Sequence, residues 1–321
     1  MTFFITLLVA IYMGWSMGSN DAANCVGADI GSGDMKLKHG IIITCVFSLL
    51  GAILLGSNVI KTIGKGVVPI HLLPKEKADL IALTSLLGAA VWVTIATYKK
   101  FPVSTSHSIV GAVAGGGLAL HTVVKWEKIS QIVICWVLTP VGSAILVILI
   151  YPVLRRIFSL PLLKKFERPI ITTSLYLTSM YLAFTWGAND VANATGVLIG
   201  TGRVSPRIAA LIGGIAITIG VTTWGYRVIE TVGFKITNLT PLMTIGIEIA
   251  ASLNIQLYTH FGIPVSTSHS IVGAVWGVGL LHGIKAVNLR LFRDIVLAWA
   301  FTPVISGIIT YGLLSLILVL K

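Results

Sequence analysis

Eight stretches of this chain contain no Asp, Glu, Lys or Arg, and most of them are long enough to cross a lipid bilayer as a helix. They cover residues 39–60, 80–98, 101–124, 129–154, 169–189, 208–226, 249–284 and 295–320. A hydrocarbon core of about 30 Å requires about 20 apolar helical residues. Only 11% of the 321 residues are charged, against about 25% in a soluble domain. The sequence therefore predicts an all-α integral membrane protein and excludes a water-exposed globule.

The basic excess of the chain does not indicate a nucleic-acid-binding protein. The formal net charge is +12, but the 23 Lys and Arg residues are scattered through short loops, in runs no longer than two. Cytoplasmic loops of membrane proteins carry such an excess, whereas a nucleic-acid binder concentrates it on one face. The Cys and His spacings match no metal site, and no nucleophile–base pair is apparent, so we expect no enzyme. Residues 1–4 carry no basic n-region of a signal peptide, so we expect the first segment to stay as a helix.

Three sequence motifs occur twice, in the same order and at nearly constant spacing. They are Gly18–Asn24 with Gly187–Asn193, Pro102–Val113 with Pro264–Val275, and Trp136–Val141 with Trp299–Val304. The second pair is identical letter for letter. Such a duplication predicts two homologous repeats, residues 1–154 and 169–321, joined by a linker at residues 155–168.

The linker carries five basic residues and one acid, which favours the cytoplasmic side of the membrane. We therefore expect a multi-pass protein of the plasma (inner) membrane with residues 155–168 inside. Each repeat offers about five membrane segments, and an odd number of crossings inverts one repeat relative to the other, as in many transporters. Alternatively, the segments that begin at Pro102 and Pro264 are broken helices or re-entrant hairpins that do not cross fully.

The motif Asn-Asp-x-x-Asn in both repeats predicts a cation site. On a helix its two amides share one face, and the carboxylate lies about 100° around the axis. Carboxylate, amide and carbonyl oxygens are ligands of hard cations, and we expect Gly14, Gly18 and Gly187 to let the helices open and expose such carbonyls. The candidate ligands are Asn20, Asp21, Asn24, Asn189, Asp190 and Asn193. The alternative is a buried polar network that only holds two helices together.

The motif Pro-Val-Ser-Thr-Ser-His predicts an anion site in each repeat. Proline suits the first turn of a helix, Ser and Thr are preferred caps, and a helix N-terminus attracts anions. The candidate anion-binding residues are Ser104, Thr105, Ser106, Ser266, Thr267 and Ser268. The alternative is that these small residues only cap helices and pack at helix interfaces. For His107 and His269, proton-linked, anion-facing, packing and orienting roles stay open.

Glu248 is an acid inside an apolar segment, which makes it a candidate functional residue. It has no counterpart in the first repeat, where the aligned residue is Leu86. The alternative is an interfacial glutamate near Lys235.

The paired Gly-x-Asn-Asp-x-Ala-Asn motifs and the two Pro-Val-Ser-Thr-Ser-His blocks resemble those of the inorganic phosphate transporter (PiT) family, over nearly the whole chain. The resemblance implies a sodium- or proton-driven phosphate symporter with inverted repeats, often a homodimer. It also implies that Asp21, Asn24, Asp190 and Asn193 coordinate Na⁺ and that the six hydroxyl residues surround phosphate. Animal relatives carry a glutamate that Glu248 matches and another where this chain has Ser48, which leaves the coupling ion open.

We therefore expect a secondary active symporter that takes up inorganic phosphate with Na⁺. Phosphate carries between one and two negative charges near neutral pH, so at least two cations are needed for electroneutral uptake. Each elementary charge moved through 100 mV contributes about 2.3 kcal/mol. The alternatives are a proton-coupled phosphate or sulfate permease and an anion channel.

Overall fold

The structure is a computed structural model that describes residues 2–31, 33–99, 103–161, 167–226, 229, 239–282 and 289–320. The described part is helical and contains no strand. Its elements, in chain order, are α1 (Thr2–Gly31), α2 (Leu37–Leu55), α3 (Ser57–Lys65), η1 (Ile70–Leu72), α4 (Lys75–Tyr98), α5 (Thr105–Ala119), α6 (Trp126–Phe158), α8 (Glu167–Gly200), α9 (Pro206–Gly220), η2 (Val221–Gly225), α11 (Pro241–His260), α12 (Thr267–His282) and α13 (Leu289–Val319). The prediction of an all-α protein is confirmed.

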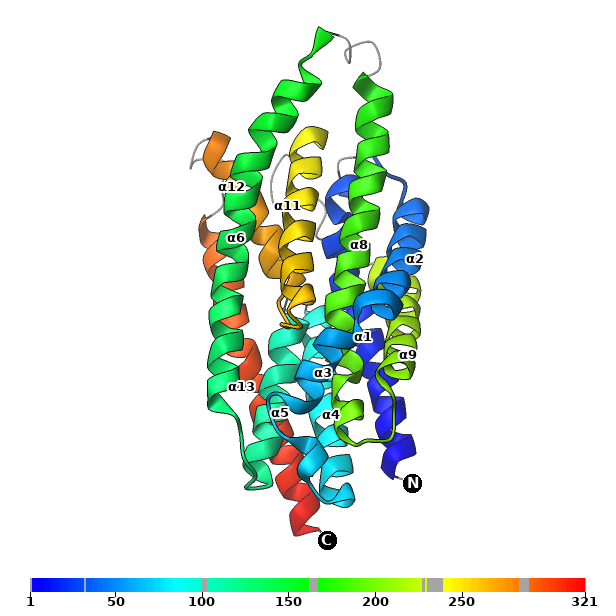
Figure 1. Cartoon of the computed structure of the whole chain (residues 1–321), viewed down its shortest axis with the longest axis vertical. Helices are drawn as coiled ribbons and strands as arrows, with labels where there is room; N and C mark the ends of the chain where they lie inside the picture. Colours follow the sequence, from blue (N-terminus) through cyan, green and yellow to red (C-terminus); the bar gives the residue numbers. More distant parts are fainter. Residues whose placement is uncertain are drawn as a thin grey trace.

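The helices form one elongated bundle (Figure 1). Both chain termini lie at one end of it, and the end of α6 and the start of α8 lie at the opposite end (Figure 1). Within the described residues, six helical segments are long and apolar enough to cross a membrane. They are Thr2–Gly31, Leu37–Leu55, Lys75–Tyr98, Trp126–Phe158, Pro206–Gly225 and Arg293–Val319.

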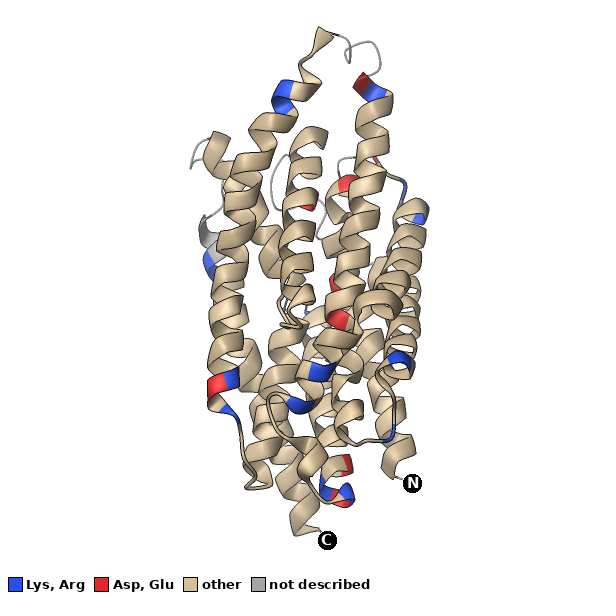
Figure 2. Ribbon diagram, in the orientation of Figure 1, with Lys and Arg blue, Asp and Glu red and all other residues tan. Residues whose placement is uncertain are grey.

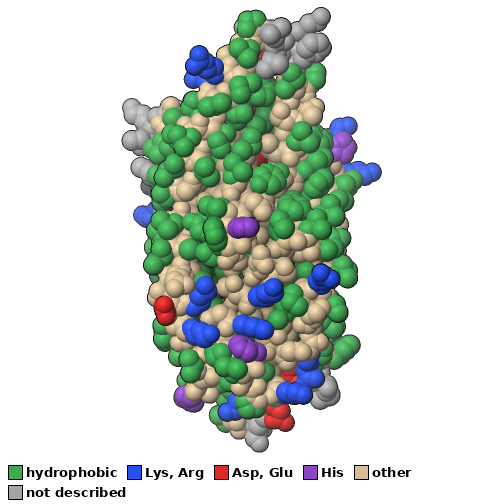
Figure 3. Space-filling view, viewed as in Figure 1, with side chains coloured by type: hydrophobic (Ala, Val, Ile, Leu, Met, Phe, Trp, Pro, Cys, Tyr) green, Lys and Arg blue, Asp and Glu red, His purple; other side chains and the backbone are tan. Residues whose placement is uncertain are grey.

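The surface of the bundle matches a lipid environment. Figure 3 shows hydrophobic side chains over most of one face, with Lys and Arg gathered in a band near the lower end and at a few upper positions. On α6, Val137, Val141, Ile145 and Leu149 are each more than half exposed, at 64%, 51%, 54% and 63%. A soluble protein rarely exposes so large an apolar patch, so this helix face contacts lipid. The chain is a multi-pass membrane protein.

The helices that carry the Pro-Val-Ser-Thr-Ser-His motifs, α5 and α12, are the second arms of two helical hairpins, α4–α5 and α11–α12, and are too short to cross a membrane fully. The helix α5 has 15 residues and α12 has 16, or about 22–24 Å at 1.5 Å per residue, which is shorter than a hydrocarbon core of about 30 Å. In Figure 1, α11 descends to a turn at mid-height and α12 returns from that turn. Ser106 Oγ donates a hydrogen bond to Val265 O at 2.8 Å, so the two hairpin tips meet inside the bundle. Pro102 itself lies outside the described residues.

The prediction that glycines open the helices at the Asn-Asp motifs is wrong. Both α1 and α8 run unbroken through these motifs. A Cβ atom on Gly18 would lie 2.1 Å from Ile217 O, and one on Gly187 would lie 2.0 Å from Ser48 O. These glycines therefore permit close packing of α1 on α9 and of α8 on α2, as small residues do in membrane helices.

Replacement of Gly18 tests this packing role. Gly18→Ala should lower the melting temperature of the detergent-solubilised protein by several degrees, because overpacking costs about 1–3 kcal/mol. Gly312→Ala is the control, since a Cβ atom there has nothing within 4 Å, and it should leave the melting temperature unchanged or slightly higher. Equal melting temperatures for the two variants would contradict the packing role.

Candidate functional site

The two predicted motifs of each repeat meet at the hairpin tips. Thr105 Oγ1 donates to Asp21 Oδ2 at 2.9 Å, and Thr267 Oγ1 donates to Asp190 Oδ2 at 3.1 Å. The first contact joins α1 to α5, and the second joins α8 to α12. In each repeat the long first helix is thus bonded to the start of the helix that follows the hairpin tip. The Asn-Asp motif and the Pro-Val-Ser-Thr-Ser-His motif of each repeat therefore lie side by side and form one candidate site, and the bonds of one repeat are repeated in the other.

The second asparagine of each motif links the two repeats. Asn24 Nδ2 lies 2.9 Å from Ser268 Oγ, and Asn193 Nδ2 lies 3.0 Å from Ser106 Oγ. In both contacts the amide donates to a hydroxyl of the opposite repeat. Asn24 is partly exposed, whereas Asn193 is fully buried.

The first asparagine of each motif points elsewhere. Asn20 Nδ2 donates to Thr97 Oγ1 at 2.7 Å near the end of α4. Asn189 Nδ2 donates to Thr259 Oγ1 at 2.9 Å near the end of α11, and its Oδ1 accepts from Val265 N at 3.1 Å. These two amides therefore attach the ends of α4 and α11, the first helices of the two hairpins, to α1 and α8.

Three serine hydroxyl groups at the hairpin tips accept hydrogen bonds and leave their own protons free to donate. Ser104 Oγ accepts a hydrogen bond from His107 N, and Ser266 Oγ accepts one from His269 N, so both residues are helix caps as predicted. Ser268 Oγ accepts from Asn24. None of the three donates to an acceptor within the described ranges. These hydroxyls and the first turns of α5 and α12 provide hydrogen-bond donors for an anion.

Unpartnered oxygen atoms complete the site. Asp190 Oδ1 and Asn193 Oδ1 are buried and accept no hydrogen bond from the described residues. The salt bridges of the described residues, Asp79 with Arg203 and Arg293 with Asp294, involve neither Asp21 nor Asp190. A buried carboxylate without a basic partner is stabilised by a bound cation or by a proton, and carboxylate and amide oxygens together suit a hard cation such as Na⁺. Figure 2 shows acidic positions at mid-height within the bundle.

Glu248 lies at a second polar cluster, on α11 facing α8. It is 3% exposed, so neighbouring helices enclose its side chain. Lys235, near which the interfacial alternative placed it, lies outside the described residues. Thr178 Oγ1 donates to Glu248 Oε2 in a short hydrogen bond. Ser179 Oγ lies 3.2 Å from Glu248 Oε1 and 2.7 Å from Asp29 Oδ2.

Asp29 was missed by the sequence reasoning. It is fully buried and lies near the end of α1, which continues beyond the Asn-Asp motif to Gly31. Like Glu248, it has no acidic counterpart, since Leu198 aligns with it in the second repeat. An acid that lies close to a repeated motif and has no acidic counterpart in the other repeat is the signal that identifies it.

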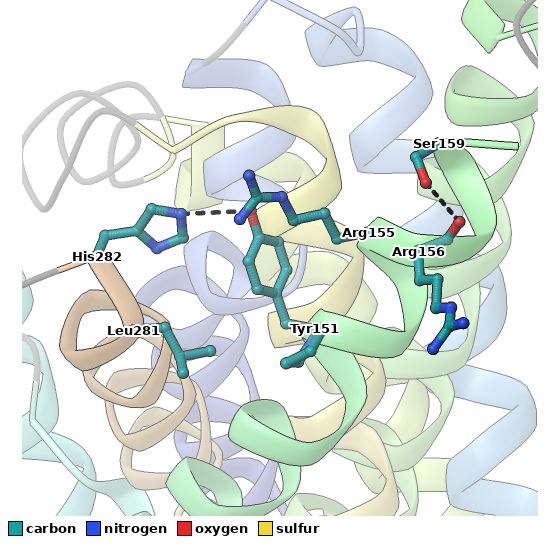
Figure 4. Close-up of a pocket in the computed structure, with 7 residues that line it drawn as sticks. Tyr151, Arg155, Arg156, Ser159, Leu281 and His282 are labelled. Atoms are coloured by element: carbon teal, nitrogen blue, oxygen red, sulfur yellow. Dashed lines mark hydrogen bonds between the residues drawn. The ribbon is translucent and has the colours of Figure 1, made fainter.

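A separate basic pocket lies at the end of α6, near the end of α12 (Figure 4). Its volume is about 450 Å³, and Tyr151, Pro152, Arg155, Arg156, Ser159, Leu281 and His282 line it. Ser159 Oγ donates to Arg156 O at 2.7 Å, and Tyr151 Oη lies 3.5 Å from His282 Nε2. None of the predicted site residues lines this pocket.

Comparison with known proteins assigns the chain to a family. Residues 17–310 match the model of the phosphate transporter family. The chain belongs to this family. It is a transporter of phosphate, as the resemblance implied, and not an enzyme.

Relatives match this chain over most of its length. A protein of Pyrococcus horikoshii named as a phosphate permease is 33% identical over 98% of this chain and 97% of its own length. The chloroplastic inorganic phosphate transporter 2-1 of Arabidopsis thaliana is 28% identical over 93% of this chain and 69% of its own. A solved structure named as the sodium-dependent phosphate transporter is 27% identical, with a TM-score of 0.85 and 99% of both chains covered.

Proposed function

We propose that this transporter takes up inorganic phosphate together with Na⁺. The observation that carries the proposal is the pair of hydrogen bonds from Thr105 to Asp21 and from Thr267 to Asp190. Each bond joins an anion-binding helix start to a cation-binding carboxylate. The name of the solved structure similar to this chain supports Na⁺ as the coupled ion.

In this proposal phosphate binds between the hairpin tips. Its oxygens accept hydrogen bonds from Ser104, Ser266 and Ser268 and from the first turns of α5 and α12. Thr105, Ser106 and Thr267 complete the wall of the site. Hydroxyls and helix ends hold the anion without a basic side chain, which suits a carrier that must release its cargo.

Na⁺ binds beside phosphate in this proposal, on the oxygens of Asp21, Asn24, Asp190 and Asn193. A cation there lowers the cost of two buried carboxylates and attracts the anion. Each ligand therefore raises the affinity of the other by the same factor. Asn20 and Asn189 support the site through the hairpins.

We also propose that residues 1–154 and 169–321 are inverted repeats. The support is that the first repeat runs from the end with the termini to the opposite end, and the second runs back (Figure 1). Arg155 and Arg156, at the end of α6, favour a cytoplasmic linker and an inner-membrane location. The homodimer stays a prediction from the resemblance.

Radiolabelled phosphate uptake into proteoliposomes tests the proposal, with Na⁺, K⁺ or a pH jump as the only variable. We expect concentrative uptake that needs an inward Na⁺ gradient and stops when the gradient collapses. Uptake driven by the pH jump alone would indicate proton coupling, and downhill flux alone would indicate a channel. Competition by sulfate would identify a sulfate permease.

Loss of the Ser268 hydroxyl, one of the three with a proton free to donate, should weaken phosphate binding. Ser268→Ala should reduce phosphate affinity severalfold, because one hydrogen bond contributes about 0.5–1.5 kcal/mol. The control is Ser108→Ala, since Ser108 Oγ donates to Ala89 O of α4 at 3.3 Å and its hydroxyl proton is therefore already used. Equilibrium binding of radiolabelled phosphate to purified protein is the measurement. Parent-like affinity in Ser268→Ala would place the anion elsewhere.

A further inference from the structure

The repeated Trp-x-x-Thr-Pro motif, which the binding site does not explain, places a proline inside each of two long helices. Pro140 lies within α6 and Pro303 within α13. A proline has no N–H group, so the carbonyl four residues earlier loses its helical hydrogen bond. The two carbonyls released in this way are those of Trp136 and Trp299. Both tryptophans are buried, at 5% exposure each, and a buried carbonyl needs a donor.

Histidines of the opposite repeat supply these donors. His107 Nδ1 lies 2.9 Å from Trp299 O, and His269 Nδ1 lies 3.0 Å from Trp136 O. A carbonyl oxygen only accepts hydrogen bonds, so Nδ1 of each imidazole carries the proton. Both histidines are almost fully buried, at 4% and 3% exposure. The bonds span 192 and 133 residues of sequence.

Ring contacts complete a four-residue cluster of His107, Trp136, His269 and Trp299. The ring centroids of His107 and Trp136 are 3.7 Å apart, those of His269 and Trp299 are 3.6 Å apart, and those of the two histidines are 4.6 Å apart. The ring of His107 thus contacts the ring of Trp136 while its Nδ1 bonds the carbonyl of Trp299. His269 makes the reverse pair of contacts, with the ring of Trp299 and the carbonyl of Trp136. Trp136 Nε1 also donates to Pro264 O at 3.2 Å, at the tip of the second hairpin.

Glycines bring the hairpin arms close enough for these bonds. The helix α5 packs against α13, and α12 packs against α6. A Cβ atom on Gly111 would lie 2.1 Å from Pro303 O, and one on Gly273 would lie 2.2 Å from Pro140 O. Each hairpin arm therefore rests on the proline-containing turn of the other repeat.

We propose that His107 and His269 are positioning residues for phosphate binding. Each follows directly after a site hydroxyl, Ser106 or Ser268, and donates its backbone N–H to the capping serine. Its imidazole bonds the tryptophan carbonyl that the proline leaves without a helical partner, and this bond attaches the start of α5 or α12 to the opposite repeat. The pair of bonds sets the spacing of the two hairpin tips between which phosphate binds, an inference that rests on the proposed function above.

Two substitutions of His107 separate the hydrogen bond from the ring. In His107→Asn the side-chain N–H group replaces Nδ1–H at the same number of bonds from the backbone, whereas in His107→Gln it lies at the distance of Nε2. We expect His107→Gln to weaken phosphate binding about tenfold, or about 1.4 kcal/mol, and His107→Asn to stay within about threefold of the parent. Equal weakening in both variants, or parent-like binding by His107→Gln, would overturn the proposal.

Pro303→Ala distinguishes positioning from simple satisfaction of a buried carbonyl. Alanine restores a backbone N–H that bonds Trp299 O within α13. In the double variant His107→Gln/Pro303→Ala we expect the melting temperature to recover while phosphate affinity stays reduced. Recovery of both would show that His107 only satisfies the carbonyl.

The tautomer gives a readout that does not require transport. Long-range ¹H–¹⁵N spectra of the detergent-solubilised protein with ¹⁵N-labelled histidine should show Nδ1–H imidazoles for both His107 and His269, one signal absent from His107→Asn and the other from His269→Asn. His282 Nδ1 also lies 3.0 Å from a carbonyl oxygen, that of Val278, so its Nδ1–H signal should persist in both variants. The Nε2–H tautomer at His107 or His269 would overturn the proposal. If the parent protein bound no phosphate, the proposed function would fail while these spectra still tested the contacts.

Discussion

Asp190→Asn should raise the Na⁺ concentration needed for half-maximal phosphate uptake by at least about tenfold, or abolish uptake. Asp190 is 1% exposed, and its Oδ1 accepts no hydrogen bond from the residues that the structure describes. Asparagine keeps the size and one oxygen but removes the charge that stabilises a buried cation, and a loss of about 1.4 kcal/mol is already tenfold. Asp21→Asn should act in the same direction, since its bond to Thr105 mirrors that of Asp190 to Thr267.

The measurement is initial uptake in proteoliposomes as a function of Na⁺ at fixed phosphate. Asp294→Asn is the control for loss of one acidic charge, because the Asp294 side chain is 50% exposed and pairs only with its neighbour Arg293 among the described residues. It should leave the sodium dependence unchanged. Unchanged sodium dependence in both Asp21→Asn and Asp190→Asn would return these residues to a purely structural role.

The residues of the central site were predictable from sequence because the membrane makes polar groups costly. A carboxylate or a cluster of hydroxyls within an apolar segment needs a partner. The duplication repeats the same polar residues in both halves of the chain, which singles them out a second time. The positions of Asp21 and Thr105 beside each other could not be predicted, since they lie 84 residues apart.

Other features depend on packing that hydropathy does not record. The apolar run from residue 101 is long enough to cross, yet α5 begins only at Thr105 and ends at Ala119. Gly18 favours an open helix by its local freedom, but the contact with Ile217 O gives it a packing role. The bond between His107 and Trp299 joins two repeats, and no local pattern indicates such a pair.

Glu248→Gln should uncouple phosphate movement from its driving ion. Glu248 lies outside the hydroxyl site and contacts Thr178 and Ser179 of α8, the helix that carries Asp190. The substitution keeps the shape of the side chain but fixes it in a neutral form. We expect phosphate binding to persist, concentrative uptake to fall at least about tenfold, and phosphate exchange across the membrane to stay within about twofold of the parent.

The dependence on pH and Na⁺ distinguishes two roles for Glu248. If its carboxylate binds or anchors a cation, Glu248→Gln loses concentrative uptake at every pH and keeps exchange. If Glu248 carries a coupled proton, uptake by the variant loses its pH dependence near neutrality while its Na⁺ dependence survives. Parent-like uptake and exchange under all conditions would mean that Glu248 has no part in coupling.

Asp29→Asn shows whether Glu248 acts alone. Ser179 Oγ lies within hydrogen-bond distance of both carboxyl groups, at 2.7 Å from Asp29 Oδ2 and 3.2 Å from Glu248 Oε1. A change at one acid therefore alters the hydrogen bonding and the electrostatic environment of the other. We expect Asp29→Asn to reproduce the uptake and exchange pattern of Glu248→Gln, and the double variant to add little to either. Additive losses would indicate two independent sites, whereas a parent-like Asp29→Asn would assign coupling to Glu248 alone. Because neither acid has a counterpart in the other repeat, shared behaviour would place coupling at the contact of α1, α8 and α11 and make the two repeats unequal partners in transport.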